Sequence, residues 1–377
     1  MNQKSPMQPL MPSDPSGSGS AGERTRRDRE LLIMLAVALS LLLLLLAFFT
    51  PIAWRRAQAD AALAAQKLPD DEQTGELSDE QEAAATNATT ADSQGEIPVG
   101  NEPDYAKYMP AITDATLTIE DGALDASHAI LVDLTTGEAL AQRLADERIY
   151  PASMTKIMTV LVAAEMLSGA ELEMTVTMSA EIVNAAIREG ASRAGFEPEE
   201  RVKLIDLLYG AALPSGADAT SALAQYLAGS EAQYVELMNQ KAEKLGLENT
   251  HFVNASGLHD DGHYSTVREI AALMSYAMDN ELCRRLLSAA SYTTSATDQH
   301  PYGITLYSTT FSRMTSTTFG PVSIIAGKTG YTDEARFCLV SLATRPDGRE
   351  YVLVTVGGSS KYAPVSDCDQ VYGKYLF

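Results

Sequence analysis

An uninterrupted apolar stretch near the N-terminus does most to limit what this chain can fold into. Residues 31–49 are apolar except for Ser40, and a helix of about 19 such residues can cross the hydrocarbon core of a bilayer. Arginines precede this stretch at positions 24, 26, 27 and 29, and Trp54, Arg55 and Arg56 follow it. This pattern predicts a disordered cytoplasmic tail over residues 1–30 and a single-pass transmembrane signal anchor over residues 31–53 in the cell membrane, with the rest of the chain extracytoplasmic.

A cleaved signal peptide is the alternative interpretation of the same stretch. Ala57-Gln-Ala59 fits the small-x-small pattern of a cleavage site, which would give a protein secreted after cleavage near Ala59. The segment before the apolar run is long, and the run exceeds the usual 7 to 15 residues of a signal peptide. We therefore favour the retained anchor, and both interpretations place the remainder outside the cytoplasm.

The segment after the anchor changes sharply in composition. Residues 60–110 contain about a dozen acidic residues against Lys67 and Lys107, and almost no bulky apolar side chain before Ile97. Such a segment cannot bury enough apolar surface to offset the entropy lost on ordering. We predict an acidic disordered linker over residues 54–110. It carries nearly half of the chain's net charge of −22, and this acidity argues against nucleic acid as a partner.

The remaining residues, 111–377, have the periodicities of one folded domain. A hairpin is expected from Ala129–Asp133 and Glu138–Gln142, turned at Gly137. We predict helices over residues 153–166, 204–212, 217–227, 232–245 and 267–278, and further strands over residues 322–325, 337–343 and 351–356. Strands at both ends with helices between them predict an α/β (α+β) fold, in which a mostly antiparallel sheet closes over central and flanking helices.

Three short motifs suggest a serine nucleophile that needs no histidine. Ser153 and Lys156 are three positions apart, so on a helix their side chains lie on one face within hydrogen-bond reach. A desolvated, neutral lysine can take the seryl proton. Such a pair is weak evidence alone, but Ser215 follows in Pro-Ser-Gly-Ala, and Lys328-Thr-Gly330 comes later. Their order is the signature of the penicillin-recognising serine enzymes.

The chain also resembles one branch of these enzymes over roughly residues 111–360. Residues 129–138, 249–258 and 263–266 are similar to segments of the low-molecular-weight penicillin-binding proteins, which are D-alanyl-D-alanine carboxypeptidases. The resemblance implies the penicillin-binding/β-lactamase-like transpeptidase fold and a catalytic domain over residues 111–377. It also implies removal of the terminal D-alanine from peptidoglycan stem pentapeptides, with no cofactor or metal, and acylation by β-lactam inhibitors.

The resemblance implies a catalytic role for three side chains. Ser153 would attack the peptide carbonyl and form an acyl-enzyme, Lys156 would be its base, and Ser215 would relay a proton towards the leaving amine.

The resemblance also implies a substrate-binding role for four consecutive residues. Lys328 and Thr329 would hold the terminal carboxylate, and Gly330 would let the extended substrate approach the strand. The backbone N–H of Tyr331, together with that of Ser153, would stabilise the oxyanion.

Two positions depart from the family pattern. Ala217 stands where the middle motif normally has an asparagine, and no arginine follows the last strand, where Lys361 is a substitute cation. The alternative function is therefore a catalytically weak or inactive penicillin-binding or wall-binding protein. A β-lactamase is a poorer alternative, because the Glu-x-x-Leu-Asn segment of the class A enzymes is absent.

Other candidate sites are less favoured. His259 and His263 are four apart, but Gly262 and its turn-forming neighbours oppose the helix that a zinc-protease motif needs. Cys338 lies in an apolar run and is interpreted as a core residue. The sequence leaves open whether Cys283 and Cys368 form a disulfide.

Overall fold

The computed structural model describes residues 104–376. The expected cytoplasmic tail, the transmembrane segment and nearly all of the expected linker lie outside these residues. Among the helices of the described part, none has the length and apolar character needed to cross a bilayer.

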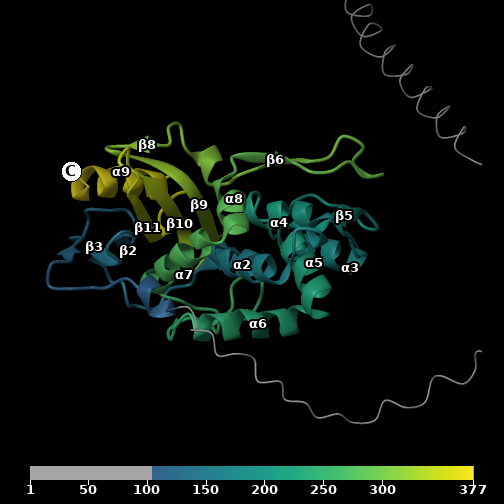
Figure 1. Ribbon diagram of the computed structural model, residues 1–377, viewed down its shortest axis with the longest axis horizontal. Helices are drawn as coiled ribbons and strands as arrows, with labels where there is room; N and C mark the ends of the chain where they lie inside the picture. Colours follow the sequence, from purple (N-terminus) through teal and green to yellow (C-terminus); the bar gives the residue numbers. More distant parts are fainter. Residues whose placement is uncertain (1–103, 377) are drawn as a thin grey trace, which may run out of the picture. The chain divides into compact units, whose positions relative to one another are not determined.

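A seven-stranded sheet forms one half of the domain (Figure 1). Its order is β1-β3-β2-β11-β10-β9-β8, and all neighbours are antiparallel except β1 and β3. The strands are β1 (Leu117–Thr118), β2 (His128–Asp133), β3 (Glu138–Arg143), β8 (Thr318–Phe319), β9 (Val322–Thr332), β10 (Arg336–Thr344) and β11 (Glu350–Gly358). The middle strands β2, β11 and β10 are mostly apolar because helices cover both of their faces. One face packs on α9 (Ala363–Tyr375), and the other packs on α7 (Val267–Asp279).

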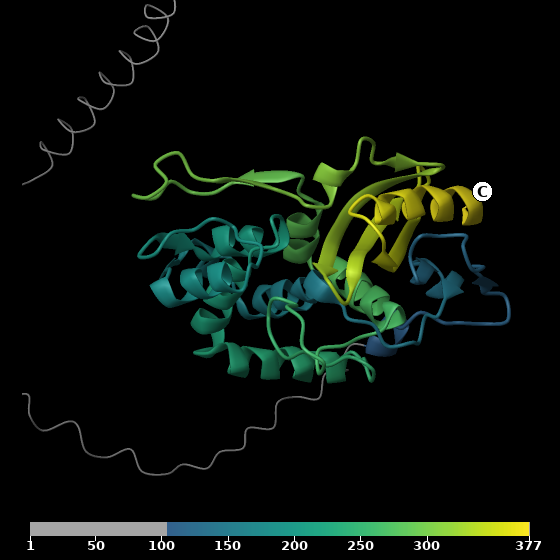
Figure 2. The same ribbon diagram turned by 180° about the vertical axis from the view of Figure 1, so that it is seen from behind.

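Helices form the other half, around α2 (Lys156–Met166) (Figure 2). Nine of the eleven α2 residues are buried, which explains why its sequence is apolar on nearly all sides. The surrounding helices are α3 (Ala180–Arg188), α4 (Leu204–Ala212), α5 (Ala217–Ala228), α6 (Glu231–Lys244) and α8 (Glu281–Ser288). Two small two-stranded antiparallel sheets, β4 (Thr175–Thr177) with β5 (Arg201–Lys203) and β6 (Ser291–Thr293) with β7 (Thr305–Tyr307), complete this half.

The sequence predicted the first hairpin and most of the long helices to within one or two residues, but it placed one functional segment wrongly. The strand expected over residues 322–325 continues to Thr332, so Lys328-Thr-Gly330 lies within β9 rather than after it. Gly327 and Gly330 lower the strand propensity of this segment. Pairing with β10 from Ser323 to Thr332 overrides that preference. Helices α3, α8 and α9, strands β1 and β8 and the two small sheets were not predicted.

The packed domain also begins earlier than residue 111. Residues Tyr105–Tyr108 form a 3₁₀ turn that contacts α7. The ring centroids of Tyr105 and Tyr276 are 5.7 Å apart, and the Tyr108 hydroxyl donates to Asp279 at 2.6 Å. The last residues of the expected linker are therefore part of the folded domain.

The three cysteines are buried free thiols. Cys283 and Cys368 are not paired. Cys338 is fully buried in β10, as expected for a core residue, and burial raises the pKa of its thiol to about 12.

Because α2 is packed on all sides, we expect its core contacts to dominate the stability of the domain. Leu161 in α2 is fully buried. Leu161→Ala should lower the free energy of unfolding by about 2–5 kcal/mol, through lost burial and the cavity left behind. The matched control is Leu117→Ala, because Leu117 is 56% exposed and its loss should cost less than about 0.5 kcal/mol. Urea unfolding measures both, and equal losses would contradict the central position of α2.

Candidate active site

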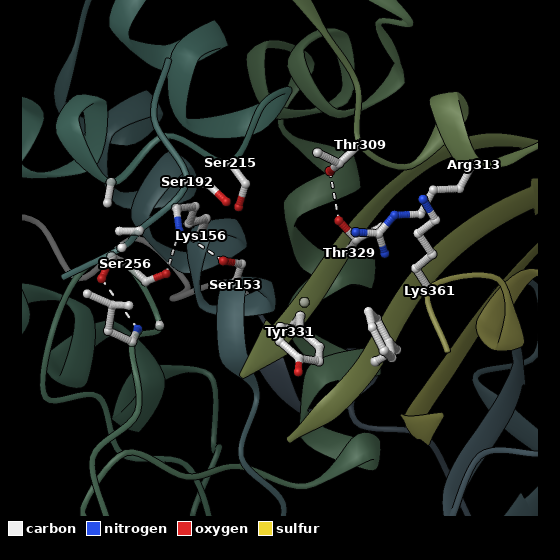
Figure 3. A pocket seen from close by; sticks show the side chains of 17 residues that line it. Ser153, Lys156, Ser192, Ser215, Ser256, Thr309, Arg313, Thr329, Tyr331 and Lys361 are labelled. Carbon is white, nitrogen blue, oxygen red and sulfur yellow. Dashed lines mark hydrogen bonds between the residues drawn. The ribbon is translucent and has the colours of Figure 1, made fainter. Parts of the chain in front are cut away.

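A pocket of about 300 Å³ lies between β9 and the helical half of the domain, and Ser153, Lys156, Ser215, Thr329, Gly330 and Tyr331 all line it (Figure 3). The sequence-predicted residues therefore meet, although up to 178 positions of sequence separate them. Lys328 is fully buried and is absent from the lining.

The nucleophile candidate and its base are held at a helix start. Ser153 lies in a 3₁₀ turn, Ala152–Thr155, and Lys156 is the first residue of α2. Lys156 Nζ donates to Ser153 Oγ at 3.0 Å. Burial lowers the pKa of Lys156 to about 7, although the carboxylates of Asp218 and Glu231 oppose this shift. A substantial neutral fraction near pH 7 makes Lys156 a competent proton acceptor.

A second group holds Lys156, and the sequence analysis gave it no role. The Lys156 ammonium also donates to the backbone carbonyl of Ser256, in the loop between α6 and α7. Asn254 Oδ1 shapes this loop by accepting from the Gly257 N–H at 2.7 Å. Gly257 has φ +78°, and a Cβ there would overlap the Ala152 carbonyl. Only glycine allows the loop to approach so closely to the 3₁₀ turn Ala152–Thr155, which we call the nucleophile turn.

Ser215 and Lys328 form a second hydroxyl–amine pair. Lys328 Nζ donates to Ser215 Oγ at 2.9 Å and to the carbonyl of Thr329 at 3.1 Å. Burial is the main cause that lowers the pKa of Lys328 well below its usual value, with Lys156 and Arg313 adding to it. Ser215 has φ +67°, a left-handed conformation that costs a non-glycine residue on the order of 1–3 kcal/mol and is typical of active sites. The hydrogen bond from Lys328 Nζ fixes the position of the Ser215 hydroxyl.

The pocket side of β9 is an open sheet edge. β8 pairs only with Val322 and Ser323, so the strand that carries Lys328-Thr-Gly330 has no neighbouring strand there within residues 104–376. An extended peptide can add to such an edge. Thr329 Oγ1 lies 2.7 Å from Thr309 Oγ1, which fixes the position of its hydroxyl.

Gly330 lines the pocket and also lies close to the turn that carries Ser153. A Cβ at Gly330 would lie 3.0 Å from the Pro151 carbonyl oxygen and 3.1 Å from the Ala152 Cβ. The absent side chain therefore makes room for the turn Ala152–Thr155. Tyr331 follows with a half-exposed ring whose centroid is 4.4 Å from that of Phe337.

Arg313 is a site residue that the sequence analysis missed. It lies in the 3₁₀ turn Phe311–Arg313 and lines the pocket close to Thr329 and Lys361 (Figure 3). Its Nη1 is buried and has no hydrogen-bond partner among the described residues. Burial lowers the pKa of its guanidinium below the usual value of arginine. A half-buried guanidinium with one buried, unpaired N–H group is suited to an anionic ligand. No motif surrounds Arg313, so only the fold could reveal it.

Ala217 offers no polar side-chain group to the pocket. It is the first residue of α5, and its backbone N–H donates to the Ser192 carbonyl at 2.7 Å. The adjacent Asp218 carboxylate accepts from the N–H groups of Ala194 at 2.8 Å and Gly195 at 3.1 Å. These bonds place the loop that carries Ser192 at the pocket wall, where Figure 3 shows the Ser192 side chain beside Ser215.

The two histidines considered for zinc lie on a turn, not on a helix. His263 contacts Thr155 and Val253, whereas His259 lies near Asp261 and Glu334. No cluster of three or more histidine, cysteine or acidic side chains in residues 104–376 is arranged to hold a metal ion.

Comparison with known proteins agrees with this geometry. Residues 115–360 match the family model described as D-alanyl-D-alanine carboxypeptidase. The chain is 34% identical over 233 residues to D-alanyl-D-alanine carboxypeptidase DacF of Bacillus subtilis, covering 62% of this chain and 57% of the relative. It is 40% identical over 171 residues to DacC of Escherichia coli, covering 44% and 42%. The chain thus spans about half the length of these curated relatives.

A solved structure is similar over almost its full length. The Streptomyces K15 DD-transpeptidase has a TM-score of 0.60 and 30% identity, and the match covers 68% of this chain and 99% of that one. Because the family model matches well over half of the chain, and the pocket assembles the serine, lysine and Lys-Thr-Gly motifs, this chain belongs to the D-alanyl-D-alanine carboxypeptidase family of serine peptidases.

Proposed function

We propose that this protein is a serine D-alanyl-D-alanine carboxypeptidase that removes the terminal D-alanine of peptidoglycan stem pentapeptides. The observation that carries the proposal is the 3.0 Å hydrogen bond between Ser153 Oγ and the buried amine of Lys156. We also infer that the domain acts outside the cell membrane, to which residues 31–53 anchor it.

The first chemical step forms an acyl-enzyme. Neutral Lys156 takes the proton of Ser153 while Oγ bonds to the carbonyl carbon of the penultimate D-alanine. Negative charge develops on the carbonyl oxygen, and the backbone N–H groups of Ser153 and Tyr331 are its proposed donors.

The second step expels the leaving group. The carbon–nitrogen bond breaks, and Lys156 gives up the proton taken from Ser153, which passes through the Ser215 hydroxyl, held by Lys328 at 2.9 Å, to the departing D-alanine amine. Water then attacks the ester carbonyl while Lys156, neutral again, accepts a proton from it. Lys156 returns this proton to Ser153 Oγ as the ester carbon–oxygen bond breaks, which frees Ser153 and the shortened peptide acid.

The terminal carboxylate distinguishes this substrate from an internal peptide. Lys328 was the expected cation for it, but Lys328 is fully buried beneath Ser215. Arg313 presents a buried, unpartnered Nη1 at the pocket beside Thr329. We therefore assign the carboxylate to Arg313 and Thr329, and we give Lys328 the role of holding Ser215.

Two alternatives use the same pocket. A weak or inactive penicillin-binding protein is favoured only by the missing side chain at Ala217. A β-lactamase would have to hydrolyse its penicilloyl ester quickly. Mass spectrometry of the protein after incubation with penicillin and with a pentapeptide separates all three, since only a carboxypeptidase keeps the penicilloyl adduct and releases D-alanine.

Acylation should depend on pH through Lys156. Burial lowers the pKa of Lys156 from 10.5 to about 7, and only the neutral amine accepts a proton. The second-order rate constant for labelling by a fluorescent penicillin should therefore rise about tenfold per pH unit below pH 7 and level off above it. The intrinsic hydrolysis of the penicillin at each pH is the control. A midpoint near 10.5 would show that Lys156 is not desolvated in the working enzyme.

Arg313 and Lys361 make a matched pair for testing carboxylate recognition. Arg313→Met should lower kcat/KM for release of D-alanine roughly 10- to 150-fold, because a hydrogen bond to a charged group contributes about 1.5–3 kcal/mol. Lys361→Met should change it less than about threefold, since Lys361 is exposed. A pentapeptide with a C-terminal amide should be insensitive to both changes. Equal sensitivity of acid and amide substrates to Arg313→Met would contradict the assignment.

Ala217→Asn separates the active enzyme from the inactive one. If other groups do the work of the missing amide, wild type releases D-alanine and Ala217→Asn changes the rate little, which is the result we expect. If the loss is disabling, restoring the amide should accelerate release roughly 30- to 1000-fold, or about 2–4 kcal/mol of transition-state stabilisation. Ser153→Ala sets the baseline. Release at that baseline by both wild type and Ala217→Asn would remove the carboxypeptidase proposal.

A further inference from the structure

One buried histidine close to the site has no part in the chemistry proposed above. His263 is 2% exposed and lies between two segments that the catalytic pair depends on. One is the nucleophile turn, Ala152–Thr155, and the other is the Ser256 loop, which we define as residues 253–258.

Two hydrogen bonds determine where the proton of His263 sits. The backbone N–H of Val253 donates to Nδ1 at 3.2 Å, so Nδ1 must carry a lone pair. The proton is therefore on Nε2, which donates to Thr155 Oγ1 at 2.7 Å. Only the neutral ring with this tautomer satisfies both bonds, because a charged ring would place a second donor opposite the Val253 N–H.

Each of the two His263 hydrogen bonds is made to a segment that contacts or carries Lys156. Thr155 directly precedes Lys156 in the chain, and Val253 begins the loop whose Ser256 carbonyl accepts from Lys156 Nζ. The same two segments touch directly at Gly257, where an added Cβ would lie 2.9 Å from Thr155 Oγ1. The imidazole thus joins the turn that carries the nucleophile to the loop that holds its base.

We propose that His263 is a positioning residue, whose neutral ring locks the Ser256 loop to the nucleophile turn and so keeps Lys156 in place to take the proton of Ser153. The proposal rests on the acylation chemistry proposed above. His263 itself touches neither substrate nor the reacting atoms.

The surroundings of His263 keep it neutral at ordinary pH. Burial is the main cause that lowers the pKa of His263 to about 4, and Lys156, His251 and His259 add to this shift. Asp260 is the acidic group that opposes it. Lowering the pH through about 4 should put a proton on Nδ1, break the bond from Val253 and release the loop. Protonation of His263 should then lower the acylation rate further, in addition to the loss caused by protonation of Lys156.

The first test compares variants of the full chain at pH 7.5, by the rate constant for labelling with a fluorescent penicillin. His263→Phe keeps a ring but neither hydrogen bond, and it should label about 10- to 100-fold more slowly than wild type. His263→Asn retains an acceptor where Nδ1 lies, so it should lose less. His251→Asn, at an exposed histidine beside the same turn, is the matched control and should label normally. A folded His263→Phe protein that labels within threefold of wild type would overturn the proposal.

The second test has a readout that a purely structural role would not move. In wild type, the logarithm of the labelling rate should fall with a slope of one between pH 6.5 and 4.5 and steepen towards two below pH 4. His263→Asn has no group that titrates there, so its slope should stay at one. Near-ultraviolet circular dichroism at each pH confirms that the protein is folded. If the logarithm of the labelling rate of folded wild type keeps a slope of one at every pH, the proposal is refuted, even if His263→Phe does not fold. Absence of labelling in wild type at every pH would instead refute the proposed function.

Discussion

The removal of the Lys156 amine from water is the condition on which the rest of the site depends. In solvent, this amine would be protonated at neutral pH and could accept nothing from Ser153. In the fold it lies at the start of the central helix α2, with Ser153 Oγ at 3.0 Å and the Ser256 carbonyl as its polar partners. Because burial disfavours the charged form, the pKa of Lys156 falls to about 7, and the neutral amine can accept the proton of Ser153.

The two halves of the domain contribute different parts to this site. The helical half supplies the nucleophile turn, the Ser256 loop and Ser215, which are held in fixed and partly strained conformations. The sheet half supplies the open edge of β9, against which an extended peptide can lie. Gly330 and Gly257 allow β9 and the Ser256 loop to approach the nucleophile turn from different sides, so the turn is positioned by both halves of the protein.

The basic side chains at the pocket are arranged to suit a peptide that ends in a carboxylate. Arg313 provides a half-buried cation near Thr329, where we propose that the terminal carboxylate binds. Lys328 and Lys156 are both buried, and burial lowers the pKa of each. The two amines whose pKa burial lowers thus lie beside the two hydroxyls, whereas Arg313 lies beside Thr329 (Figure 3).

The sequence by itself determined the family of this protein and much of its secondary structure. The spacing of Ser153 and Lys156, the order of the three motifs and the periodicity of α2, α4 and α5 are local properties, and they predicted the nucleophile, the base and the helical centre. Only the tertiary structure decided the contributions of Ser256, Arg313 and His263, because a backbone carbonyl, a lone arginine and a turn histidine acquire these roles through neighbours distant in sequence. The same holds for Lys328: the sequence showed its motif, but its burial beneath Ser215 follows from the pairing of β9 with β10 and the packing of β9 against the turn Ala152–Thr155.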